Sequence, residues 1–111
     1  MRIPVSRWDF AAWGSPGLDA VGDLHQPAEN FRVSLYRYPD GTEFHGTAIA
    51  SRWYILAGVC LLNLESSFLK LAAGEIADLP TGKYRLSVSG SATVELVVAW
   101  ELPPKFRSTV F

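Results

Sequence analysis

The stretch Trp53-Tyr54-Ile55-Leu56-Ala57 is apolar at every position and follows the polar pair Ser51-Arg52. A short apolar run of this kind is typical of a strand that is covered on both faces, because an exposed face would need a polar side chain at every second position. It is far shorter than the roughly 20 residues that cross a bilayer. We therefore expect residues 53–57 to form a fully buried strand.

Other short strands are predicted on both sides of this run. Phe31 to Leu35 and Lys83 to Ser89 alternate between apolar and polar side chains, which is the period-2 pattern of a half-buried strand. Turn residues such as Pro39-Asp40-Gly41 separate the runs. Residues 59–63 could form one helical turn. The strands that the sequence predicts are residues 31–35, 44–50, 53–57, 67–72, 83–89 and 93–100. Six short strands divided by turns predict an all-β fold, a small antiparallel barrel or sandwich.

The chain has 111 residues, enough for one domain with a core. Residues 1–30 keep neither the helical nor the strand period, so we expect an irregular N-terminal arm there. A single β-barrel domain is expected in residues 31–106, followed by a C-terminal tail at 107–111. Trp8 and Trp13 lie in the arm, which has no core of its own, so they either fold back onto the barrel or contact a partner.

Composition and charge exclude several classes of function. The formal net charge is −1 and the basic residues are scattered, so nucleic acid is not an expected partner. The single cysteine, Cys60, excludes an internal disulfide and a cysteine-based metal site. No carboxylates are spaced as a metal site would need, and we expect no cofactor or metal. No run is long enough to span a membrane, and charges at Arg7 and Asp9 interrupt the region that a signal peptide keeps apolar.

A longer segment, from Thr47 to Cys60, reads TAIASRWYILAGVC and resembles the signature around the catalytic histidine of trypsin/chymotrypsin-like serine proteases. Ala20-Val21-Gly22-Asp23 resembles the start of the mature enzymes, and residues 97–106 resemble the segment that leads toward their catalytic aspartate. The resemblance covers residues 20–106. It implies the first barrel of that family, a six-stranded, Greek-key-like antiparallel barrel.

In this resemblance, Val59 occupies the position of the general-base histidine of the family. Valine has no lone pair and cannot take a proton from a serine hydroxyl. The resemblance thus implies no catalytic residue and no serine endopeptidase activity. It implies a pseudoprotease that acts as a binding or regulatory module. The face that packs on a second barrel in active relatives would be apolar and uncovered, and would self-associate or bind a protein partner.

Two alternatives stay open. The chain ends at Phe111, where the family's chain continues, so it could be a truncated fragment of a longer trypsin-like protein. An enzyme based on Cys60 would need a lowered thiol pKa and a basic neighbour. His45 is one residue away from the strand position that would face Cys60, so a Cys60–His45 pair is disfavoured. Localisation is open, because the family implies secretion whereas the absence of disulfides and of a signal peptide in this sequence opposes it.

Overall fold

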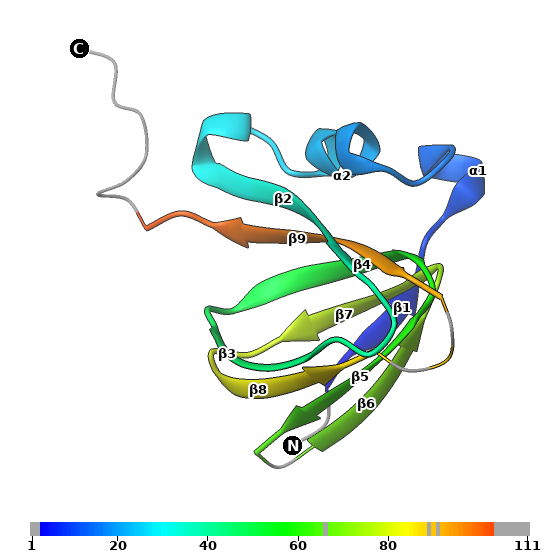
Figure 1. The fold of residues 1–111 in the computed structure, drawn as a ribbon. Helices are drawn as coiled ribbons and strands as arrows, with labels where there is room; N and C mark the ends of the chain where they lie inside the picture. Colours follow the sequence, from blue (N-terminus) through cyan, green and yellow to red (C-terminus); the bar gives the residue numbers. More distant parts are fainter. Residues whose placement is uncertain (1–2, 66, 89, 91, 104–111) are drawn as a thin grey trace.

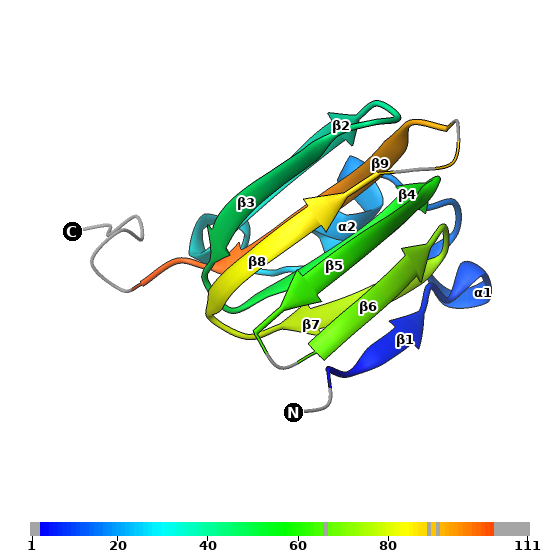
Figure 2. The same cartoon turned by 60° about the horizontal axis from the view of Figure 1, so that its bottom comes forward.

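The structure is a computed structural model that describes residues 3–65, 67–88, 90 and 92–103. Two antiparallel β-sheets pack face to face, and short helices cover the outer face of the first sheet (Figure 1). Figure 2 shows the second sheet in front, with α2 (Leu18–Leu24) behind the first sheet. Among the described residues, no helix lies on the outer face of the second sheet in either view.

The two sheets divide the strands as follows. In spatial order the first sheet contains β1 (Val5–Arg7), β7 (Glu75–Leu79), β4 (Ser51–Ala57), β9 (Val94–Glu101) and β2 (Phe31–Tyr38). The second contains β3 (Glu43–Ala48), β8 (Gly82–Ser87), β5 (Val59–Leu64) and β6 (Ser67–Ala72). The helices are α1 (Phe10–Trp13), α2 (Leu18–Leu24) and a 3-10 turn (Ala28–Asn30).

Strand β4 is buried on both faces at residues 53–55, as its sequence predicts, whereas Leu56 is half-buried and Ala57 is exposed. Trp53 and Ile55 belong to the core between the sheets, whereas Tyr54 belongs to a second apolar cluster under α2. All three side chains are at most 5% exposed. Successive side chains of a strand point to opposite faces, so an apolar residue at every position is what a sheet with two covered faces requires.

The prediction of a six-stranded trypsin-type barrel is wrong. The described residues form nine strands in two sheets, and β1, β5 and β7 were not among the predicted strands. The helical turn expected at 59–63 is strand β5, because Cys60 and Leu62 alternate into the core between the sheets and are fully buried there. The sequence did not predict β7, because the charged Asp78 interrupts its apolar residues. The Asp78 carboxylate forms an ion pair with Arg52 of the neighbouring strand β4.

Residues 3–30, expected to be irregular, contain β1, α1, α2 and the 3-10 turn. Strand β1 pairs with β7, and Trp8 after it is buried at 5% exposure, with its Nε1–H donating to the Gly14 carbonyl at 2.8 Å. Trp13 packs edge-on against Trp8 and keeps 38% of its surface exposed. Partner contact at Trp8 and Trp13 therefore stays a prediction, and it falls chiefly on Trp13.

The described part of the chain has no helix that is long and apolar enough to cross a membrane. The division into an arm and a barrel domain at residue 30 stays a prediction. The C-terminal tail expected at 107–111 lies outside the described residues.

Gly58 makes the turn from β4 in the first sheet to β5 in the second, and we expect it to tolerate no side chain. Its φ is +76°, and a Cβ there would lie 2.6 Å from the Thr93 carbonyl oxygen. Backbone strain of this kind costs roughly 1–3 kcal/mol, and the clash adds to it. Gly58→Ala should lower the free energy of unfolding by at least roughly that amount in urea denaturation.

Gly22→Ala is the control, because Gly22 lies inside α2 with nothing within 4 Å of an added Cβ. This change should raise the free energy of unfolding by about 0.5–1 kcal/mol. A Gly58→Ala variant as stable as the parent would contradict the geometry at this turn.

Candidate functional site

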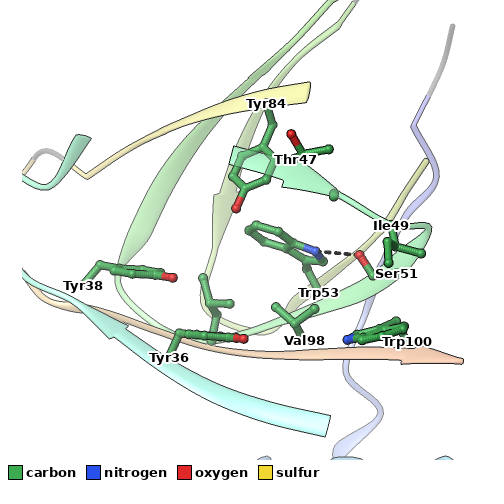
Figure 3. Close-up of a pocket in the computed structure, with 11 residues that line it drawn as sticks. Tyr36, Tyr38, Thr47, Ile49, Ser51, Trp53, Tyr84, Val98 and Trp100 are labelled. Carbon is green, nitrogen blue, oxygen red and sulfur yellow. Dashed lines mark hydrogen bonds between the residues drawn. The ribbon is translucent and has the colours of Figure 1, made fainter. Parts of the chain in front are cut away.

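A cavity of about 290 Å³ opens between the two sheets, beside β2 and β3, which are edge strands of their sheets (Figure 3). Its walls come from β2, β3, β4, β8 and β9 and from the segment between β3 and β4. The described residues that line it are Tyr36, Tyr38, Thr47, Ala48, Ile49, Ser51, Trp53, Tyr84, Leu96, Val98 and Trp100. None of these side chains carries a formal charge.

Strand alternation selects which side chains reach the cavity. On β2, Tyr36 and Tyr38 line it, whereas Arg37 between them forms an ion pair with Glu95 at 2.9 Å. On β9, which pairs with β2, residues 96, 98 and 100 line the cavity while Val97 and Ala99 pack in the cluster under α2. The cavity and the helix layer therefore use opposite faces of the same two strands.

Three phenol groups supply much of the polar surface of the cavity. Figure 3 shows the hydroxyls of Tyr36, Tyr38 and Tyr84 pointing into it from two strands. Burial raises the pKa of Tyr38, and the nearby Tyr84 and Tyr36 raise it further. Burial, followed by Tyr36, also raises the pKa of Tyr84. Both phenols thus stay protonated at neutral pH and can donate hydrogen bonds.

Gly46 allows Tyr84 to lie in this position. The two residues are directly opposite each other on β3 and β8, and a Cβ on Gly46 would come within 2.5 Å of the Tyr84 ring. Glycine within a strand often marks such a close approach of another group. The Tyr84 ring also packs edge-on against Trp53, with the ring centroids 5.4 Å apart. Its position is therefore restricted on two sides.

The residues that the sequence interpretation singled out lie elsewhere. Val59 is half-buried at the start of β5, opposite Ala72 of β6, and is not among the residues that line the cavity. Cys60 is fully buried in the core between the sheets, and burial raises its pKa to about 11. His45 is exposed on β3. A Cys60-based enzyme would need a lowered thiol pKa, so the structure contradicts that alternative.

Metal binding by a protein site needs several side chains such as His, Cys, Asp or Glu around one point. Within the described ranges of the chain, no group of three or more such residues could hold a metal ion.

Comparison by sequence finds no matching family model and no matching curated protein. Comparison of structures does find similar proteins. A cupin 2 conserved barrel domain protein from Salinispora arenicola matches 88% of this chain and 74% of its own, with a TM-score of 0.57 and 16% identity. The cupin domain of Schizosaccharomyces pombe Cnp3 matches 71% of this chain, with a TM-score of 0.57 and 14% identity. The DMSP lyase DddQ from Ruegeria pomeroyi matches 69% of it, with a TM-score of 0.58 and 19% identity.

The fold is cupin-like. At these identities the likeness concerns the fold alone. The chain covers 56% of the Cnp3 domain's chain and 41% of the DddQ chain, so it spans about half the length of these two proteins.

The cupin-like fold overturns the resemblance to trypsin-like serine proteases. Residues 47–60 run from the end of β3 through β4 into β5, and cross between the two sheets at each turn. Their apolar run and tight turn follow from the burial of β4, which any two-sheet fold would favour in the same way. Val59 therefore does not stand in for a catalytic histidine. Three expectations rested on that assignment and are wrong with it: the pseudoprotease, the fragment of a longer protease and the exclusion of enzymatic activity. One of the similar structures is itself a lyase.

We expect Cys60 of the native protein to be nearly inert toward alkylation. A thiol with a pKa of about 11 holds roughly 100-fold less thiolate at pH 8 than one with the ordinary value of 9.0, and burial blocks access as well. Iodoacetamide labelling followed by mass spectrometry should be at least that much slower in buffer than in urea. Equal rates in the two solvents would contradict the buried position of Cys60.

Proposed function

We propose that this cupin-like domain binds a small organic ligand in the cavity between its sheets. The observation that supports this is the lining: five aromatic side chains surround about 290 Å³, with no charged group among the described lining residues. Concave sites of this size, with mostly apolar walls and a few polar groups, are typical of small-molecule binding. The five are Tyr36, Tyr38, Trp53, Tyr84 and Trp100.

The lining favours a ligand that contains a ring. Aromatic pairs in offset or edge-on contact contribute about 0.5–1.5 kcal/mol beyond the area that they bury. The walls already show this geometry, since Trp53 and Tyr84 meet at 85°. Leu96 and Val98 of β9 add aliphatic surface, so a ring can replace water in the cavity at a gain in free energy.

The likeness to a DMSP lyase raises the question of chemistry in the cavity. Proton transfer needs a group whose pKa is close to the working pH. Among the described lining residues, Tyr38 and Tyr84 have pKa values raised above the ordinary value of 10.0, so neither is a base near neutral pH. We therefore propose binding, with the phenols as hydrogen-bond donors.

Titration with 2-phenylethanol tests this function, followed by tryptophan fluorescence and by saturation-transfer NMR. We expect saturable binding, and Trp100→Leu should weaken it roughly fivefold, because that change removes one ring from the wall. Thermal unfolding of the variant shows that its fold is kept.

Phe68→Leu is the matched control. It removes a ring that is 62% exposed on β6 and that is not part of the cavity lining. Its dissociation constant should equal that of the parent. Absence of binding, or equal weakening in both variants, would show that the cavity is not the site.

A further inference from the structure

We infer that the cavity selects an uncharged ring compound with an acceptor oxygen, such as an aromatic ketone, whose oxygen receives hydrogen bonds from Tyr38 and Tyr84. This inference rests on the proposed function and names the ligand class of the same site.

The phenols of two strands converge on one space. Tyr38 comes from β2 in the first sheet and Tyr84 from β8 in the second, and both hydroxyls point into the space between them (Figure 3). Tyr36 joins them from β2, with its ring parallel to that of Tyr38 within 5° and the centroids 6.1 Å apart. The charge of an ionised Tyr84 or Tyr36 would disfavour ionisation of Tyr38, because the three phenols lie near one another.

These hydroxyls have no partner among the described protein groups. Across residues 3–65, 67–88, 90 and 92–103, none of the three forms a hydrogen bond with a protein group. Other polar aromatic groups nearby do have partners: Tyr54 shares a hydrogen bond of 2.8 Å with His25, and Trp53 Nε1–H donates to Ser51 Oγ at 3.0 Å. Tyr36 is 41% exposed, whereas Tyr38 and Tyr84 are half-buried, and hydroxyls without a protein partner are free to bind a ligand or water.

The lining supplies hydrogen-bond donors and acceptors. The described lining has hydroxyls and the indole N–H groups of Trp53 and Trp100 as its polar side-chain groups, and it has no amide or carboxylate side chain. Ser51 Oγ already accepts a hydrogen bond from Trp53. Each hydroxyl can donate one hydrogen bond and can also accept, whereas the indole N–H of Trp100 can only donate, so the lining can supply several hydrogen bonds to an acceptor oxygen of a ligand.

The uncharged lining disfavours ionic ligands. A carboxylate or phosphate that entered the cavity would lose hydration with no Lys, Arg or His in the described lining to compensate. An ammonium ion would find no carboxylate there, although aromatic faces attract cations. A neutral carbonyl loses the least hydration and gains the phenol hydrogen bonds. The lining therefore favours the neutral ligand over either ion.

Four probes that share a phenyl ring make this measurement. Acetophenone has an acceptor oxygen, ethylbenzene has none, benzoate is an anion and phenyltrimethylammonium is a cation. We expect acetophenone to bind roughly 10- to 100-fold more tightly than ethylbenzene, the equivalent of two hydrogen bonds, and more tightly than either ion. Tighter binding of benzoate or of phenyltrimethylammonium would overturn the inference on charge.

Variants locate the hydrogen bonds. Tyr38→Phe and Tyr84→Phe keep the rings and remove the hydroxyls, and each should weaken acetophenone binding roughly 3- to 10-fold while leaving ethylbenzene unchanged. Tyr54→Phe is the control, because its phenol lies on the other face of the first sheet, beside His25. Its acetophenone affinity should match that of the parent.

The outcomes separate the two proposals. Acetophenone and ethylbenzene could bind equally, with unchanged acetophenone affinity in both Tyr→Phe variants. The cavity would then bind rings without recognising an acceptor oxygen, so the inference would fail and the proposed function would stand. If none of the four probes binds but 2-phenylethanol does, only the inference fails, and if 2-phenylethanol also fails to bind, the proposed function fails with it. Because the probe series uses the unchanged chain, a variant that loses its fold leaves the test in place.

Discussion

The burial of β4 on both faces is the constraint on which the rest of the structure depends. Trp53 and Ile55 fill the space between the sheets, and Tyr54 and Leu56 face the helix layer. Full burial of a large apolar side chain contributes about 1.5–3 kcal/mol, and this strand supplies several in succession. It also pairs with β7 on one side and β9 on the other, so both layers of the molecule are built against it.

The cavity lies where the packing between the two sheets ends, at their edge strands β2 and β3. Aromatic side chains replace aliphatic ones near β2 and β3, where Tyr38, Phe44, Tyr84 and Trp53 form a chain of ring contacts with centroids 5.2–6.1 Å apart. Each of these rings packs against the next, and Gly46 leaves room for one of them to lie across its strand. Packing of this kind limits the rotamers that Tyr38 and Tyr84 can adopt, and fewer rotamers to lose on binding lower its entropy cost.

The sequence predicts the strands better than their assembly. Alternation at 31–35 and 83–89 and the apolar run at 53–57 identify strands correctly, because these patterns depend on local burial. The site could not be predicted in this way. A tyrosine on an alternating strand has the same pattern whether it faces a core or a cavity, and only the pairing of distant strands brings residue 84 near residues 36 and 38. Val59 was assigned to the position of a catalytic histidine because residues 47–60 resemble a protease motif, but the apolar residues of that motif reflect the burial of β4.

The alternation along β4 and β9 also separates two kinds of sequence change. Residues 98 and 100 can be exchanged to reshape the cavity while residues 54, 97 and 99 continue to hold the helix layer, whereas residues 53 and 96 also belong to the core between the sheets. An insertion or deletion of one residue would instead turn every following side chain to the other face. Ligand preference in such a fold is therefore free to diverge through point substitutions, whereas the length of these strands is under strict constraint.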